Sequence, residues 1–394
     1  MQLDKQELVK ILKEQGYDAV ADTVAEQVAD NFTRASNDVI GVLCEHLREN
    51  DELIPSDATK ISNVAKRRDL GEIESILANA SNKSIEEIDS LLEVLAQEND
   101  NLASALFEYK NKTPKSYSND EELKAILQKS AENMKDGMIN ISNTSAIRVN
   151  INNQLITMDK AYVKVVNQGI FAAQQGYVAY YTAIRQVVRK MSEEGVKRID
   201  FASGKSRRLD SQARMNVLEG IRMFNQEYRM KQGEQFGADG VEISAHFPCA
   251  PDHLAYQGKQ YSNDAFEELQ NSLSRPIGTL NCTHSIAPII LGISEPAYSD
   301  EELQKAKEMS EKEVTYTDTL GRKRTTTGYG ATQVQRYKEL QVRKLRDQQK
   351  ALEKIGDVDG AKAVKKQVTQ AKKEYRRVSE ELKLPVRENR IRGF

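Results

Sequence analysis

Apolar residues in the first part of the chain recur every three or four positions, which is the spacing of one helix face. In DKQELVKIL this face follows Asp4, which can cap the helix, and Glu7 stands at the third helical position. The stretch SIEEIDSLLEVLAQ repeats the pattern, with Ser84 as the cap and Glu87 completing a capping box. The pattern predicts short amphipathic helices over residues 1–115, an N-terminal helical region without candidate chemistry.

A polar stretch, NKTPKSYSND, interrupts this pattern and predicts a domain boundary. After it, Asn119 can cap a helix whose C-terminal end is expected at Gly137. The alternation of IRVNIN then predicts a strand over residues 147–152, and residues 158–195 have the pattern of two long helical segments. A central helical domain is therefore expected over residues 118–236.

The segment VKRIDFASGKSRRLD contains a Gly-Lys-Ser triplet, which also occurs in phosphate-binding loops. The spacing excludes such a loop, because Ile199 stands where the first glycine is required. We expect a strand in VKRIDF, a turn in SGK and a long helix from LDSQARMN onward. GADGVEISAH then predicts a strand in which Val241 and Ile243 point to one side.

Residues 301–394 combine strand-forming and helix-forming patterns. VTYTDTLGRKRTTTGYG is rich in Thr and Tyr, and Gly321 marks the turn of a predicted β-hairpin. Two amphipathic helices follow, over residues 331–356 and 361–385, joined by GDVDG. Their heptad-like spacing predicts a C-terminal helical hairpin that docks on a partner or packs on itself. The positions that carry this spacing are Val334, Tyr337, Leu345, Leu352, Val364, Val368, Tyr375, Val378 and Leu382.

Composition agrees with a helical protein that has much exposed surface. Of the 394 residues, 39% are hydrophobic and 29% are charged, and there is no Trp. Such a composition favours elongated helical pieces over one deep globule. The predicted fold class is mostly α and elongated, with a small α+β module that contains Cys and His over residues 237–300 and a basic helical arm within residues 301–394.

Charge is unevenly distributed, although the net charge is only -2. Residues 1–120 carry 13 Lys and Arg against 24 Asp and Glu, whereas residues 321–394 carry 21 against 9. A basic C-terminal region suits DNA or an acidic protein surface, and it is equally typical of a solvated helical arm. No apolar run approaches the roughly 18 to 20 residues of a membrane span. The N-terminal residues also lack the apolar region of a signal peptide, so we expect a cytoplasmic protein. Three cysteines are too few for a disulfide framework, so we expect Cys44, Cys249 and Cys282 to be reduced.

The chain has three Cys and four His residues, and five of these seven lie between positions 246 and 284. They form the pattern H-x2-C-x3-H, a gap of 28 residues, and then C-x-H. Thiolates and imidazoles suit a tetrahedral Zn²⁺, and such an ion can lock a loop-rich segment that has little core of its own. The candidate ligands are Cys249, His253, Cys282 and His284, with His246 as a further candidate.

Other interpretations of these residues stay open. Pro248 and Pro251 stiffen the first loop, so the segment also fits a metal-free, hydrogen-bonded turn. A Cys nucleophile with a His base can be drawn from the two groups, but no protease signature surrounds them. A nuclease of the His-Asn-His type is a further possibility, but Asn281 and His284 lie too close together in the sequence for the helix of that fold. Its candidate residues are Asp252, His253, Asn281 and His284.

The two groups resemble a known family. AHFPCAPDHLAYQGKQYS, followed by RPIGTLNCTHSIAPIILGISEPAYSDEEL, is similar to the phage minor capsid protein 2 family, which is related to the Mu F-like head-morphogenesis proteins. The similarity covers residues 30–305 and is strongest over residues 199–300. In Mu F-like relatives the second group often reads Cys-x-Cys, where this chain has Cys282 and His284. That exchange keeps a metal ligand and removes a disulfide partner.

The resemblance implies a structural role and no catalytic activity. It implies a minor capsid protein, present in few copies per virion, that acts near the portal in head assembly and in DNA packaging or ejection. The implied partners are the portal protein and the major capsid or scaffold protein. The implied location is the virion, and the host cytoplasm during assembly. Two alternatives stay open: a nuclease or toxin-like effector packaged in the head, and a nucleic-acid-binding adaptor that uses residues 321–394.

Overall fold

The computed structural model describes residues 4–49, 55–108, 114–142, 147–151, 154–157, 160, 196–199, 206–279, 282–354 and 356–391. These residues are mostly helical and include small antiparallel sheets, as the sequence predicts. The helical segments expected over residues 158–195, apart from residue 160, and the turn expected in SGK lie outside the described residues. Among the described helices, none is long and apolar enough to cross a membrane.

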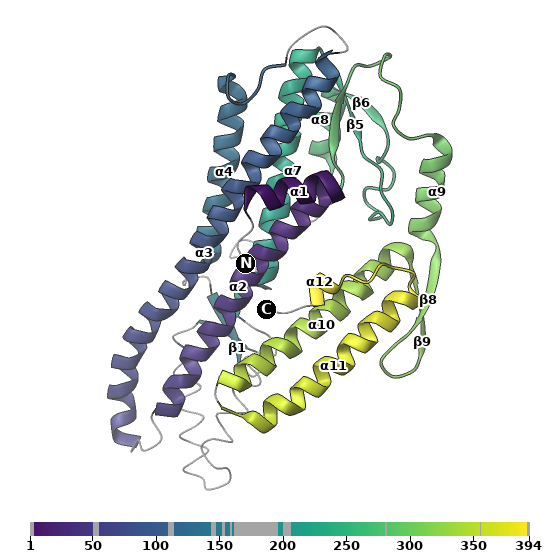
Figure 1. Cartoon of the computed structure of the whole chain (residues 1–394). Coiled ribbons are helices and arrows are strands. Elements are labelled where there is room, and N and C mark those ends of the chain that lie inside the picture. The colour runs from purple at the N-terminus through teal and green to yellow at the C-terminus, as the bar shows by residue number, and fades with distance from the viewer. Residues whose placement is uncertain are drawn as a thin grey trace.

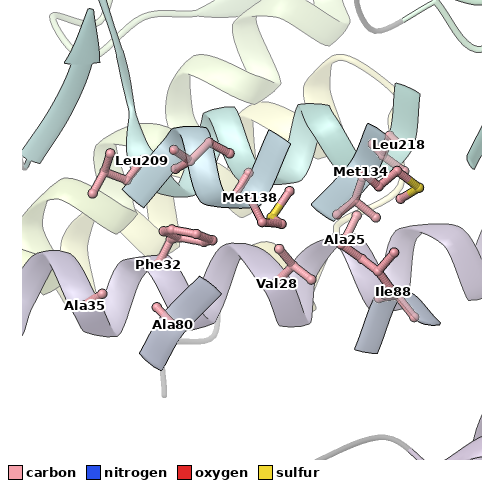
Figure 2. Close-up of a cluster of buried hydrophobic side chains, with 14 of the residues drawn as sticks. Ala25, Val28, Phe32, Ala35, Ala80, Ile88, Met134, Met138, Leu209 and Leu218 are labelled. Carbon is pink, nitrogen blue, oxygen red and sulfur yellow. The ribbon is translucent and has the colours of Figure 1, made fainter. Parts of the chain in front are cut away.

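A bundle of helices, here named the helical core, surrounds the largest hydrophobic cluster. Its helices are α1 (Lys5–Gln15), α2 (Tyr17–Glu49), α3 (Pro55–Glu108), α4 (Glu121–Ser142) and α7 (Leu209–Phe236). The four long helices α2, α3, α4 and α7 run side by side (Figure 1). In Figure 2, Phe32 and Val28 of α2 gather with Met138 of α4 and Leu209 of α7 in the space between them. The amphipathic patterns thus bury their apolar faces against one another.

The cap predicted at the start of the chain is confirmed. Asp4 accepts a hydrogen bond from the Glu7 backbone N–H at 2.8 Å and so begins α1. Gly16 follows α1 with a φ of 84°, a left-handed value that glycine adopts without strain. The chain therefore breaks at Gly16 and starts again as α2.

The helix start predicted at Ser84 is wrong. α3 continues through this position, and the Ser84 hydroxyl donates to the Ala80 carbonyl of the same helix at 2.8 Å. Ser84 and Glu87 are both buried, and they accept hydrogen bonds from the Asn31 amide of α2 at 3.2 and 3.1 Å. The residues of the expected capping box therefore join two packed helices, which a local pattern does not reveal.

Both ends of α4 differ from the prediction. Asp120, rather than Asn119, caps the helix, because its carboxylate accepts from the Leu123 backbone N–H at 3.0 Å. Gly137 does not end α4, because the helix continues to Ser142. A Cβ at Gly137 would lie 1.8 Å from Nδ2 of Asn216 in α7. This glycine therefore permits the close approach of α4 and α7, and it is not a helix stop.

The first small sheet has the antiparallel order β2-β1-β3-β4. Its strands are β1 (Ile147–Ile151), β2 (Gln154–Thr157), β3 (Val196–Ile199) and β4 (Ser206–Arg208). The strands predicted in IRVNIN and VKRIDF are thus confirmed as β1 and β3. β4 leads directly into α7, so this sheet adjoins the helical core.

The second sheet, of order β6-β5-β7, forms the centre of residues 237–300, here named the Cys and His module. Its elements are β5 (Gly240–Ile243), β6 (Gln260–Ser262), α8 (Asn263–Ser272) and β7 (Ile286–Ile289). Val241 and Ile243 are fully buried in the same small cluster, which agrees with the prediction that they point to one side of the strand. The module meets the helical core at Gly233 of α7, where a Cβ would lie 2.4 Å from Cβ of Pro288 in β7.

The C-terminal elements begin with a helix, continue with a β-hairpin and end as helices. They are α9 (Asp300–Glu311), β8 (Glu313–Thr317), β9 (Lys323–Thr327), α10 (Gly328–Lys354), α11 (Val358–Glu381) and α12 (Glu388–Ile391). The β8–β9 hairpin turns at Gly321, as predicted. α10 packs against α11 and α2. Tyr337 departs from the predicted apolar series because it is 57% exposed, whereas Val342, which that series omitted, is fully buried.

Charged contacts also fasten the C-terminal helices to the helical core. Arg208, which is 6% exposed, forms an ion pair with Asp347 of α10. Arg390 of α12 lies 3.5 Å from both Asp22 and Glu26 of α2. Buried ion pairs fix geometry strongly because breaking one partner leaves an uncompensated charge. The beginning and the end of the described chain are thus joined in one structure.

Candidate functional site

Strand pairing explains how residues far apart in sequence reach one place. β5 and β7 are antiparallel neighbours in which Ile243 pairs with Ile286. Beyond this pair, the Ser244 backbone N–H donates to the Ser285 carbonyl at 2.9 Å. The loop that leaves β5 and the loop that enters β7 therefore start from the same end of the sheet. This register brings both groups of Cys and His residues together.

The first donor set consists of His253, Cys282 and His284, all of them buried. Sγ of Cys282 lies 3.3 Å from Nδ1 of His253 and 3.1 Å from Nδ1 of His284. The three ligand atoms lie within 4.8 Å of one another. One thiol and two imidazoles at this separation have the chemistry of a Zn²⁺ site.

The second donor set consists of His246, Cys249 and His284. Sγ of Cys249 lies 3.6 Å from Nε2 of His284, and the rings of His246 and His284 have centroids 4.3 Å apart. His284 thus belongs to both sets, with one ring nitrogen toward each thiol. Of the four candidate ligands, His253, Cys282 and His284 thus lie in one donor set. Cys249 lies in the other set and is linked to the first by His284.

Hydrogen bonds from outside the donor sets orient the imidazoles. His253 donates from Nε2 to the Arg275 carbonyl at 2.7 Å, which leaves Nδ1 facing Cys282. The Arg275 side chain in turn donates to both carboxylate oxygens of Asp252, at 2.9 and 2.7 Å. His246 Nε2 lies 2.6 Å from the Thr283 hydroxyl. Such outer partners are what fixes the orientation of metal-ligating histidines.

Backbone contacts hold the first loop in place from two sides. The Cys249 N–H donates to the buried Ser310 hydroxyl of α9 at 3.0 Å. The His246 N–H donates to the side-chain oxygen of Gln257 at 3.1 Å, and that oxygen also lies 3.3 Å from Nε2 of His284. The loop is therefore positioned by residues of both the module and the C-terminal elements.

The two thiols have opposite acidities. Burial opposes ionisation of Cys282, but hydrogen bonds with His253 and His284 outweigh it and lower the pKa of this thiol to about 5. Burial, together with the nearby charge of Cys282, raises the pKa of Cys249 to about 12. Burial and His284 lower the pKa of His246 to about 4. At neutral pH, Cys282 is therefore a thiolate and His246 a neutral imidazole, and these are the forms that bind metals.

The residues expected for a nuclease are arranged differently. Asp252 is held by Arg275, so its carboxylate already has a cationic partner. Asn281 lies outside the described residues. The side chain of Cys44, the third cysteine, is also outside them. Sequence spacing did not identify Arg275 and Ser310 as supports of the site. Arg275 opens the RPIGTLNCTH run, but its contacts with Asp252 and His253 depend on the fold, and Ser310 lies outside both groups, in α9.

A family model described as Phage minor capsid protein 2 matches residues 18–378. The match begins in α2 and ends in α11, so it includes α2, α3, α4 and α7 of the helical core, the Cys and His module and most of the C-terminal elements. It therefore reaches well beyond residues 30–305, over which the sequence resemblance was recognised. Neither a curated protein nor a solved structure matches the chain.

Proposed function

Because the chain belongs to the phage minor capsid protein 2 family, we propose that it acts near the portal of the phage head. Family membership makes it a structural protein of the capsid, located in the virion and assembled with other head proteins. The proposed role is head assembly, with a part in DNA packaging or ejection. The proposed partners are the portal protein and the major capsid or scaffold protein, with few copies per particle. The single observation that carries this function is the family match over residues 18–378.

Particle composition tests the proposed location. The protein is expected to co-sediment with purified heads and to co-purify with the portal protein when the two are expressed together. Quantitative mass spectrometry of virions should find far fewer copies than of the major capsid protein. Consistent absence from purified particles would refute a virion role. Presence in particles that lack the portal would refute the portal position alone.

We further propose that the Cys and His module is stabilised by one Zn²⁺. His253, Cys282 and His284 would hold the ion, with Cys249 or His246 as the fourth ligand. The ion would lock the two loops that leave β5 and enter β7. The oriented imidazole of His253 and the low pKa of Cys282 support this assignment. The role is structural, since the ion would close a segment with a small apolar cluster.

Metal analysis tests this assignment directly. Protein purified without chelators is expected to contain about one zinc ion per chain. His253→Ala and His284→Ala should each reduce that content, whereas Arg322→Gln in the β8–β9 hairpin should not. If protein never exposed to chelator contains no zinc, the metal assignment is wrong. The segment is then a metal-free turn held by hydrogen bonds.

Two alternative functions have their own tests. A nuclease or toxin-like effector that uses these residues would lose activity in a His253→Ala/His284→Ala double variant. Activity that survives in the double variant would exclude the two histidines as catalysts. An adaptor that binds nucleic acid through residues 321–394 would show DNA affinity that falls steeply with salt.

A further inference from the structure

Two adjoining cavities separate the Cys and His module from the C-terminal helices. The larger has a volume of about 500 Å³ and is lined by Arg275 and Thr283 on one side and by Tyr329 of α10 on the other. The smaller, of about 160 Å³, lies between α2 and α7. Arg336 and Arg387 line both cavities, and the two together are here named the arginine pocket.

The arginine pocket has a large excess of positive charge. Its two carboxylates are Asp18 and Asp22. The arginines that line it come from α7, the module, α10 and the segment around α12. They are Arg214, Arg222, Arg275, Arg336, Arg387 and Arg390.

Half of these arginines already have acidic partners. Arg214 binds Asp22 and Glu26 at 2.7 and 2.5 Å. Arg390 lies 3.5 Å from the same two carboxylates, and Arg275 binds Asp252. These three arginines therefore form structural ion pairs, and Asp22 is already paired with two of them.

The other three, Arg222, Arg336 and Arg387, form no ion pair with any residue that the structure describes. Nη1 of Arg222 is buried and has no hydrogen-bond partner among the described residues. Burial lowers the pKa of Arg336, and the charges of Arg390, Arg387 and Arg214 lower it further. Asp18 lines the same cavities but makes no ion pair with these three guanidinium groups.

Unpaired guanidinium groups from three separate elements converge on the same space. Arg222 belongs to α7, Arg336 to α10 and Arg387 to the segment that precedes α12. Arg336 is exposed and the other two are half-buried, so water weakens their mutual repulsion, but holding like charges together still costs free energy that a bound anion would offset. Guanidinium binds phosphate through paired N–H donors, and three such groups match the charge of a phosphate better than that of a single carboxylate.

We propose that the arginine pocket binds a phosphate group, through Arg222, Arg336 and Arg387. The source is a free nucleotide or the phosphorylated end of a nucleic-acid chain. All three arginines line the smaller cavity, and Arg336 and Arg387 also line the larger one, whose volume of about 500 Å³ suits a ligand of nucleotide size. The bound phosphate would join α7, α10 and the C-terminal segment beside the Cys and His module. Four of the candidate metal ligands, His246, His253, Cys282 and His284, also line the larger cavity, so the phosphate site adjoins the proposed Zn²⁺ site.

Binding measurements on the full chain test the proposal. The probes are inorganic phosphate, a mononucleotide, a short 5′-phosphorylated oligonucleotide and its unphosphorylated counterpart, with glutamate as the carboxylate control. Arg336→Gln and Arg387→Gln should each weaken phosphate binding by about tenfold or more. Arg322→Gln, an exposed arginine paired with Asp318 in the β8–β9 hairpin, is the matched control and should leave binding unchanged.

Thermal unfolding separates a binding role from a structural one. Without phosphate, Arg336→Gln should unfold at the same or a higher temperature than the parent chain, since repulsion among the arginines falls. With phosphate, the parent chain should gain stability and the variant should not. Circular dichroism checks that each variant is folded, and Arg387→Gln gives an independent answer if Arg336→Gln is not.

The outcomes are distinct. Preference for the mononucleotide identifies a free nucleotide as the source, whereas preference for the 5′-phosphorylated oligonucleotide over its unphosphorylated counterpart identifies a nucleic-acid end. Equal binding of glutamate and phosphate would overturn the proposal in favour of a carboxylate site. The proposal would also be overturned if the oligonucleotide bound equally well with and without its 5′ phosphate and if neither Arg→Gln change weakened that binding. Such a result would indicate general electrostatic attraction to the protein surface.

Discussion

The helical core and the Cys and His module are held together by different kinds of contact. The core buries large apolar side chains from successive helices, and Phe32 and Leu77 are fully excluded from solvent. The module has a much smaller apolar cluster, which includes Cys282 among its members. It buries polar groups beside that cluster, including His253 and His284 at 1% and 2% exposure.

This difference determines what each region tolerates. An apolar core accepts other side chains of similar volume with modest losses of stability. A buried polar site requires every donor and acceptor to keep its partner, because an unpaired buried group is costly. The helical core therefore depends on packed volume, whereas the Cys and His module depends on a few specific atoms.

Metal removal should separate the two regions most sharply. In small zinc modules, binding of the ion contributes on the order of 10 kcal/mol to folding. With EDTA, we expect residues 244–259 to lose protection in hydrogen exchange while α2, α3 and α7 keep theirs. Equal protection with and without EDTA, in protein shown to have contained zinc, would contradict a structural role for the ion.

A cavity in the helical core should have the next largest effect. Phe32 is fully buried between α2 and its neighbours, so Phe32→Ala should lower the free energy of unfolding by about 3 to 5 kcal/mol. Chemical denaturation followed by circular dichroism measures the loss. Leu102→Ala is the control, because Leu102 is 48% exposed on α3 and its loss should cost under about 0.5 kcal/mol. Similar losses at both positions would mean that Phe32 is not packed as described.

The contact between the two regions can be disturbed at one glycine. A Cβ on Gly233 would meet the rigid ring of Pro288, so Gly233→Ala should cost about 1 to 3 kcal/mol by forcing α7 and β7 apart. Gly71→Ala in α3 is the matched control, since no atom lies within 4 Å of its added Cβ. There the change should stabilise the helix by up to about 1 kcal/mol. Thermal unfolding of the two variants should shift in opposite directions.

The smallest effect concerns a buried acid of the helical core. Burial raises the pKa of Glu87 to about 7, although hydrogen bonds from Gln27 and Asn31 oppose that rise. The folded protein therefore keeps this proton longer than the unfolded chain, and stability falls as pH rises from about 4.5 through about 7. Glu87→Gln should flatten that fall and stabilise the protein at pH 8 by on the order of 1 kcal/mol.

Thermal midpoints measured from pH 5 to pH 8 check this expectation. Part of the pH dependence should persist, because burial and Glu26 also raise the pKa of Asp30 to about 7. A Glu87→Gln variant with an unchanged pH profile would show that Glu87 titrates alike in the folded and unfolded states.

Sequence patterns predicted elements well where the deciding contacts are local. The alternation in IRVNIN, the turn at Gly321 and the buried pair in β5 depend on neighbours along the chain. Ser84 and Gly137 were misassigned because a partner on another helix decides their role. Asn31 and Asn216 are those partners, and no spacing rule connects them to the positions that they contact.

The candidate site shows the same division. Residue type and spacing marked Cys249, His253, Cys282 and His284 as candidate ligands, and the structure divides them between two donor sets that share His284. They did not predict that His284 faces both thiols, since that follows from the register of β5 and β7. The charge imbalance of the C-terminal region was visible in the sequence, but the convergence of Arg336 and Arg387 with Arg222 depends on how α10 packs.

The contact between the last helix and α2 has a consequence for the order of synthesis. Arg390 lies against Asp22 and Glu26, and Leu352 of α10 belongs to the same apolar cluster as Phe32. A ribosome makes α2 first, so this part of its surface stays uncovered until α10 and α12 have emerged. The other helices of the core can pack during translation. Closure of α2 therefore waits for α10, and a chain truncated before α10 would present that surface to the chaperones and proteases of its host.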